Sequence, residues 1–250
     1  MELWQLALLT LLGIGSGWLN VMAGGGSLLT VPVMLFLGIP GPVANGTNRI
    51  SIIAQNIVAV GSFFSKGFSD FRLSASLSVF ACIGAFFGAN VGVRLEGDAF
   101  NRVLAVIMFA ILLLMITDRA PKPKTSDEQA PAKNLVVGHV LMLGAGFWGG
   151  FIQIGVGFLL IPILNRVMGI DLVRTNMHKV FIALSFSFVA LAIFASNSEI
   201  LWQAGLALAI GNALGGYLGV RTAIAKGAEM IRRVFVIVII AMIVKLLFFS

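Results

Sequence analysis

Long hydrophobic runs, separated by short polar or glycine-rich stretches, cover most of this chain. In the first half the runs occupy residues 3–23, 28–37, 45–65, 73–93 and 103–117. Residues 3–48, 73–93, 180–198 and 200–220 contain no Asp, Glu, Lys or Arg. A spanning helix needs about 20 apolar residues, and these runs are continuous rather than alternating. The pattern therefore predicts an all-α polytopic membrane protein and disfavours an outer-membrane barrel.

Two glycine-rich breaks interrupt the hydrophobic pattern, at residues 24–27 and 154–157. The element after the first break, residues 28–37, is short for a span and is followed by a Pro/Gly turn predicted at residues 38–42. We therefore expect a broken or re-entrant helix, and whether it re-enters or crosses stays open. Unwound backbone in a bilayer needs partners from the protein, and free amides at a helix N-terminus favour an anion. The breaks predict an anion site, with a kink that binds nothing as the alternative.

The second half of the chain repeats the first. Matching residues recur in order at offsets of 127 to 130: Trp18, Gly25 and Pro32 with Trp148, Gly155 and Pro162; Thr47 and Asn48 with Thr175 and Asn176; Gly84, Gly88 and Gly92 with Gly211, Gly215 and Gly219. This internal duplication predicts two repeats of about five hydrophobic elements each, residues 1–117 and 135–250, joined by a polar linker at 118–134. An odd number of elements per repeat predicts that the two repeats are inverted.

The loop charges favour one topology. Basic residues in segments 66–72 and 221–233 place both segments inside, and segment 94–102 then falls outside with both termini. This topology changes if the short element re-enters. The glycines spaced by four, which end near Arg94 and Arg221, predict close helix packing of the kind expected where the two halves meet, with substrate contact as the alternative.

Composition and charge narrow the class of protein. The 250 residues are 59% hydrophobic and 11% charged, with a mean hydropathy of +1.02, whereas a soluble domain carries about 25% charged residues. The net charge is +7, but the basic residues lie mainly between hydrophobic runs, which indicates cytoplasmic loops rather than nucleic-acid binding. The single cysteine, Cys82, lies within an apolar run and is expected to be a packing residue.

Polar residues near the breaks supply candidate chemistry. Arg49 offers a planar fork for an oxyanion and Lys179 a point charge, although each lies near the start of its element and snorkelling to the interface is an equal alternative. The predicted substrate-binding residues are Gly24, Gly25, Gly26, Ser27, Asn48, Arg49, Gly155, Gly157, Asn176 and Lys179. Cavity candidates of lower rank are Asn20, Gln55, Asn56, Gln153 and His178.

No acidic residue lies well inside a predicted span, so the sequence indicates no carboxylate site for a proton or sodium ion. It contains no His/Cys/Asp/Glu cluster with metal-ligand spacing and no nucleophile–His–acid constellation. We therefore expect no enzymatic activity, no metal and no cofactor.

Together, the Gly-rich break before a Pro-containing short helix, the Thr-Asn pairs, the spaced glycines and the duplicated layout resemble the TauE/SafE sulfite exporter family over essentially the whole chain. The resemblance implies a multi-pass protein of the bacterial plasma membrane that exports sulfite or an organosulfonate such as sulfoacetate, as a secondary transporter with alternating access between the repeats. An anion channel and a membrane scaffold or assembly factor are the alternatives. The expected partners are a small anionic substrate and the lipid bilayer, with a homodimer left open and nucleic acid excluded.

Overall fold

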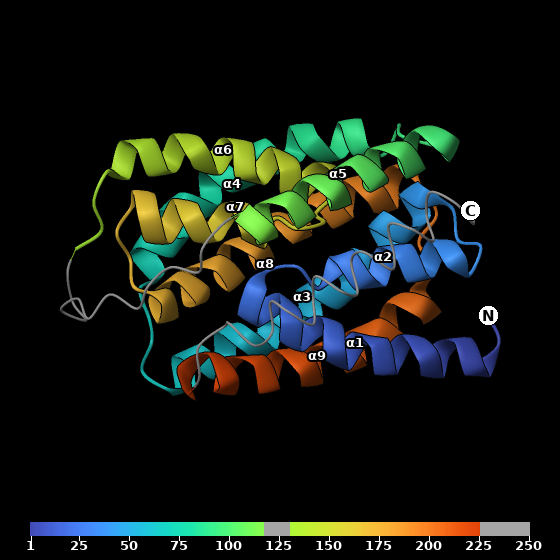
Figure 1. The fold of residues 1–250 in the computed structure, drawn as a ribbon, viewed down its shortest axis with the longest axis horizontal. Helices are drawn as coiled ribbons and strands as arrows, with labels where there is room; N and C mark the ends of the chain where they lie inside the picture. Colours follow the sequence, from blue (N-terminus) through green and yellow to red (C-terminus); the bar gives the residue numbers. More distant parts are fainter. Residues whose placement is uncertain (118–130, 226–250) are drawn as a thin grey trace.

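The computed structural model describes residues 1–117 and 131–225, and every regular element within these ranges is a helix (Figure 1). The all-α prediction is therefore confirmed for this part of the chain. In chain order the elements are α1 (Leu3–Ala23), α2 (Ser27–Phe36), α3 (Gly41–Ser65), α4 (Phe71–Gly92), α5 (Gly97–Thr117), α6 (Leu135–Phe151), α7 (Gly157–Pro162), which continues into a π-helical turn η1 (Ile163–Val167), α8 (Leu172–Asn197) and α9 (Trp202–Ala225).

Several helix boundaries differ from the sequence predictions. The turn predicted at residues 38–42 ends earlier, because α3 begins at Gly41 and proline is tolerated in the first helical turn. Helix α5 begins at Gly97, so two thirds of the loop predicted at residues 94–102 is helical. Arg221 does not end its helix: it lies inside α9 with its guanidinium 4.5 Å from the ring centroid of Tyr217. Residues 118–130 of the predicted linker and residues 226–250 lie outside the described residues.

Three of the described helices are long and apolar enough to cross a membrane: α1 over Leu3–Met22, α4 over Phe71–Gly92 and α8 over Leu172–Asn197. Helix α4 leaves large apolar side chains exposed on its outer face, among them Val79, Phe86 and Phe87. An apolar face of this kind suits lipid rather than water. The structure thus supports a membrane location for this helical fold.

The spaced glycines form two close helix contacts, and each contact joins the two halves. A Cβ atom on Gly88 of α4 would overlap the carbonyl oxygen of Phe147 on α6, and one on Gly215 of α9 would overlap that of Ile14 on α1. Side chains at these positions would separate the helices, because the backbones are in direct contact. The prediction that the glycine stripes mediate packing between the halves is confirmed.

The two halves enter the molecule from opposite ends. In Figure 1, α1 runs inward from the right and α6 runs inward from the left, while α9 lies along α1 and α4 along α6. One helix of each half therefore packs along the first helix of the other half. An inverted repeat predicts this exchange, and the inversion itself stays a prediction.

The two glycine contacts generate a test with controls on the same helices. A Cβ on Gly17 or Gly150 would overlap the backbone of Asn212 or Ala85, whereas a Cβ on Gly15 or Gly144 meets nothing within 4 Å. We expect Gly17→Ala and Gly150→Ala each to destabilise the protein by about 1–3 kcal/mol through overpacking. Gly15→Ala and Gly144→Ala should be neutral or slightly stabilising.

The melting temperatures of the four variants in detergent, followed by tryptophan fluorescence, check this expectation. An equal gain of stability in all four variants would mean that helix propensity, and not the close backbone contact, governs these positions.

Candidate functional site

The two glycine-rich breaks cross at a direct backbone contact. Gly24 ends α1 with a positive φ of 80°, and its N–H donates to the carbonyl of Asn20 at 2.8 Å. The N–H of Gly157, the first residue of α7, donates to the carbonyl of Gly24 at 3.2 Å. A Cβ on either glycine would overlap the backbone of the other. The breaks thus lie together at the interface between the halves, and one of the amides predicted to face an anion is bonded to the opposite break.

A cavity of about 20 Å³ lies beside this crossing. Its polar and glycine lining comprises Asn20, Gly24, Ser27, Asn56, Gln153, Gly157 and Lys179. Its apolar lining comprises Ile52, Val156, Leu160, Val180 and Ala183. A cavity of this size holds about one water molecule. The space beside the crossing is therefore narrow in this conformation.

Lys179 projects from α8 of the second half onto the end of α1 in the first half. Its ammonium Nζ donates to the carbonyl of Asn20 at 3.1 Å, to that of Val21 at 2.6 Å and to Oδ1 of Asn176 at 2.8 Å. The carbonyls in the last turn of a helix lack intrahelical partners and carry the negative end of its dipole. Lys179 therefore caps the broken helix α1, and Asn176 holds its ammonium in place.

Arg49 makes the reciprocal contact, from α3 of the first half onto the end of α6 in the second. Its Nη1 donates to the carbonyl of Gly149 at 3.0 Å, its Nη2 donates to that of Gly150, and Nη2 also lies 3.4 Å from Oδ1 of Asn45. The guanidinium lies 4.6 Å from the ring centroid of Phe194, a cation–π distance. Its Nε is buried without a hydrogen-bond partner.

Neither cation snorkels to the interface. Arg49 is 0% exposed and Lys179 is 3% exposed, so the snorkelling alternative is wrong for both. The buried residues within the described ranges include these two cations but no Asp or Glu. A buried charge normally requires an opposite charge or several hydrogen bonds. Here backbone carbonyls at two helix ends supply those bonds.

Three amide side chains connect α1 and α3 beside the cavity. Asn20 Nδ2 donates to Gln55 Oε1 at 3.1 Å, and Gln55 Nε2 lies 3.4 Å from Asn56 Oδ1. The Nδ2 group of Asn56 is buried and has no partner. Asn56 therefore offers an unused donor in the cavity wall.

Gln153 supplies a second unsatisfied amide. It has a positive φ of 61°, which is uncommon for a residue other than glycine, and its Nε2 donates to Ser187 Oγ at 3.0 Å. Its Oε1 is buried without a partner. Rotated by 180° about its last torsion, the same amide accepts from Ser187 and presents its NH₂ group as a donor. The site thus has two amides able to donate to an anion.

Asn48 acts beside the cavity rather than in its wall. Its Nδ2 donates to Ser27 Oγ at 3.2 Å, and its Oδ1 accepts from Thr30 Oγ1 at 2.7 Å. These bonds fix the start of α2 against α3. His178 faces the opposite side of α8, where its Nδ1 lies 2.8 Å from Ser74 Oγ on α4.

The structure brings together only part of the predicted site. Lining the cavity are Gly24, Ser27, Gly157, Lys179, Asn20, Asn56 and Gln153. Behind or away from the lining lie Gly25, Gly26, Asn48, Arg49, Gly155, Asn176, Gln55 and His178. Substrate binding by any of these residues stays a prediction. Within the described ranges no group of three His, Cys, Asp or Glu side chains is placed to hold a metal ion.

Sequence reasoning did not identify Ser187 or the apolar lining residues. Helical spacing could have identified two of the apolar lining residues. Ile52 lies four residues before Asn56, and Ala183 lies four residues after Lys179. Residues separated by four share a helix face. Projection from the polar candidates along each helix would have found these two neighbours.

Comparison with known proteins places the chain in a family. The family model for the sulfite exporter TauE/SafE matches residues 9–246. The chain is 28% identical to the probable membrane transporter protein ORF9 of a Sinorhizobium species, over 97% of this chain and 92% of that protein. It is 26% identical to a probable membrane transporter protein of Haemophilus influenzae, over 97% and 94% of the two chains.

A further relative is the probable membrane transporter protein YfcA of Escherichia coli strain K12, which is 25% identical over 94% of this chain and 87% of its own length. No solved structure matches the chain. The family match spans nearly the full sequence, and it agrees with the duplicated glycine breaks and the apolar helices described above. The chain belongs to the TauE/SafE sulfite exporter family of membrane transporters.

Proposed function

We propose that this protein is a secondary transporter of the bacterial plasma membrane that exports a small anion, sulfite or an organosulfonate such as sulfoacetate. Transport proceeds by alternating access between the two repeats, around the cavity at the crossing of the breaks. The observation that carries the proposal is the pair of buried cations, Arg49 and Lys179, without a buried carboxylate in the described residues. Lys179 lines the cavity directly.

The charge balance of the site favours an anion. A helix C-terminus carries about half a negative charge, so each capped cation keeps a positive surplus. An anion in the cavity offsets the surplus near Lys179 and accepts from the unpartnered Nδ2 of Asn56. Sulfite and sulfonate groups carry several acceptor oxygens and suit such donors. A metal cation or an organic cation would meet repulsion here.

The small cavity supports a carrier over the alternative of a channel. A channel requires a continuous pore, whereas this cavity holds about one water molecule. Two of its lining residues, Gly24 and Gly157, are in direct backbone contact, so room for an anion requires the two breaks to move apart. The scaffold alternative predicts breaks without a positively charged cavity, and the position of Lys179 in the lining favours transport.

The membrane potential supplies a driving force for export. An inside-negative potential favours anion exit by about 2.3 kcal/mol per charge per 100 mV. No carboxylate is buried among the described residues. In this proposal the membrane potential therefore acts directly on the anion and on the Lys179 side chain beside it.

Flux into and out of proteoliposomes tests the proposal. We expect radiolabelled sulfite or sulfoacetate to leave vesicles that contain the full-length protein, with saturable kinetics and at a higher rate under an inside-negative potential. Sulfate is tested alongside as the competing anion. No flux of any of the three anions would overturn the transporter proposal. Flux that never saturates would favour the channel.

Lys179→Gln should weaken anion binding. A charge-assisted hydrogen bond contributes about 1.5–3 kcal/mol, so we expect the half-saturating anion concentration to rise by about 10- to 100-fold. Lys66→Gln is the control: it removes the same charge from an exposed position after α3. An equal effect of the two substitutions would mean that net charge, and not the cavity lysine, attracts the anion.

Arg49→Gln should act mainly on stability. It removes the donors for Gly149 and Gly150 and leaves buried carbonyls unsatisfied, at a cost of about 1–3 kcal/mol per group. We expect a lower melting temperature and a smaller change in half-saturation than Lys179→Gln produces. An unchanged melting temperature with a half-saturation as high as that of Lys179→Gln would instead identify Arg49 as the direct anion ligand.

A further inference from the structure

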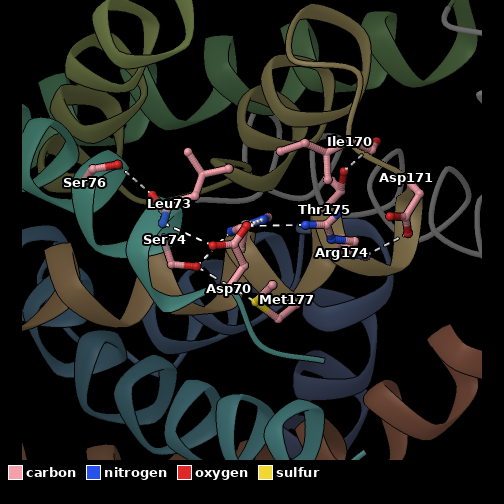
Figure 2. A network of polar contacts seen from close by, with 10 residues as sticks. Asp70, Leu73, Ser74, Ser76, Ile170, Asp171, Arg174, Thr175 and Met177 are labelled. Carbon is pink, nitrogen blue, oxygen red and sulfur yellow. Dashed lines mark hydrogen bonds and ion pairs between the residues drawn. The ribbon is translucent and has the colours of Figure 1, made fainter. Parts of the chain in front are cut away.

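A second polar cluster lies outside the cavity, where the N-terminal ends of α4 and α8 meet (Figure 2). Asp70 precedes α4, and its Oδ1 accepts from the N–H of Leu73 at 3.3 Å. Its Oδ2 accepts from Nη2 of Arg174 on α8, also at 3.3 Å. The side chains of Asp70 and Arg174 are 30% and 28% exposed. The cluster therefore connects to the outside of the helix bundle.

A buried histidine extends the cluster inward. His178 lies four residues after Arg174 on α8 and is 0% exposed. Its Nδ1 lies 2.8 Å from Ser74 Oγ. With the ring proton assigned to Nδ1, Ser74 accepts from Nδ1–H and its own hydroxyl is free to turn toward Sδ of Met177, 3.9 Å away. In this tautomer the lone pair is on Nε2, which is buried without a partner and lies 4.0 Å from Asp70 Oδ2.

The other half of the duplicated fold lacks this chemistry. At the offsets that relate the repeats, the positions of Asp70, Ser74, Arg174 and His178 correspond to Asn197, Leu201, Gly46 and Ile50. There α3 packs against α9 with Ile50 next to Gly205, and Thr47 Oγ1 accepts from the N–H of Leu201 at 3.1 Å. The helix pair thus forms without a titratable group. Packing alone does not require the acid, the arginine or the histidine at α4 and α8.

We propose that His178, with Asp70 and Ser74, forms a proton-binding site that links proton uptake to a movement of α8 relative to α4. One proton adds to Nε2, and the ring then donates from both nitrogens, to Ser74 and to Asp70. An N–H···O bond needs a distance of about 3 Å, so the present gap of 4.0 Å closes by about 1 Å. Proton binding therefore favours a different packing of these two helix ends.

Burial of the ring opposes its protonation, and the surrounding charges offset part of that cost. The charged groups that act on the ring are Asp70 before α4 and Asp171 and Arg174 at the start of α8, which together leave one net negative charge. Helix α6, which packs on both α4 and α8, carries His139, but that ring contacts Ser76 and the carbonyl of Leu135. Lys179 points away toward the end of α1.

Helix α8 connects the proton site to the cavity. Lys179 follows His178 directly, and Val180 and Ala183 also line the cavity. A shift of α8 toward Asp70 draws Lys179 from the carbonyls of Asn20 and Val21 and loosens the end of α1. This link rests on the proposed function, whereas proton binding at His178 does not.

The two histidines of the chain make the site directly measurable. In full-length protein with His139→Gln and isotope-labelled histidine, the single remaining imidazole signal in NMR spectra reports His178. We expect this signal to convert reversibly from the neutral to the doubly protonated form as pH falls. Asp70→Asn should weaken proton binding by roughly tenfold, because an adjacent carboxylate stabilises imidazolium. A ring that stays neutral throughout the pH range of the folded protein, or titrates identically in Asp70→Asn, overturns the proposal.

Anion flux tests the link to transport. At a fixed membrane potential, sulfoacetate flux through the wild type should respond to a pH gradient, and His178→Gln should lose that response. His139→Gln is the matched control and should keep it. A retained response in His178→Gln would refute the coupling. If the wild type moves no anion, the transport proposal fails, and the NMR titration still decides whether His178 binds a proton.

Discussion

The structure depends on an exchange of helix caps between its two halves. Each broken helix, α1 and α6, ends inside the molecule with carbonyl groups that lipid cannot satisfy. Lys179 from the second half bonds the end of α1, and Arg49 from the first half bonds the end of α6. The glycine contacts follow the same exchange, because α9 packs on α1 and α4 on α6. The cation at each helix end comes from the other half, so the two halves stabilise each other.

The differences between the repeats, rather than their likeness, create the candidate site. The guanidinium of Arg49 donates to the carbonyls of Gly149 and Gly150 and lies over the ring of Phe194, so these groups surround it. A lysine ammonium is compact, and Lys179 caps α1 while still lining the cavity. The two cations also lie at slightly different positions in their repeats, since Arg49 corresponds to Met177. The cavity therefore lies next to Lys179 and not next to Arg49.

The sequence predicted the helices and the glycine contacts correctly, because each has a local periodic signal. It also identified both cations, but as anion ligands, because a charge within an apolar run indicates function. Their partners are backbone carbonyls 100 or more residues away, and no side-chain pattern reveals a carbonyl. For the same reason the sequence did not show that the amide of Gly157 donates to the carbonyl of Gly24 and not to an anion. His178 ranked low because a lone histidine is more often a hydrogen-bonded helix residue than a proton relay. Asp70, which lies 4.0 Å from its ring, is 108 residues earlier in the chain.

The position of the titratable cluster has a consequence for the two ends of the molecule. In a duplicated fold a proton site required by the mechanism of both halves would occur twice, but Ile50 and Leu201 occupy the places of His178 and Ser74 in the other half. The α3–α9 contact therefore lacks a histidine at the place of His178, whereas the α4–α8 contact offers an unpartnered ring nitrogen 4.0 Å from a carboxylate. If the repeats are inverted, these two contacts face opposite sides of the membrane. Under the proposed function, proton binding at His178 then responds to the pH of one side alone.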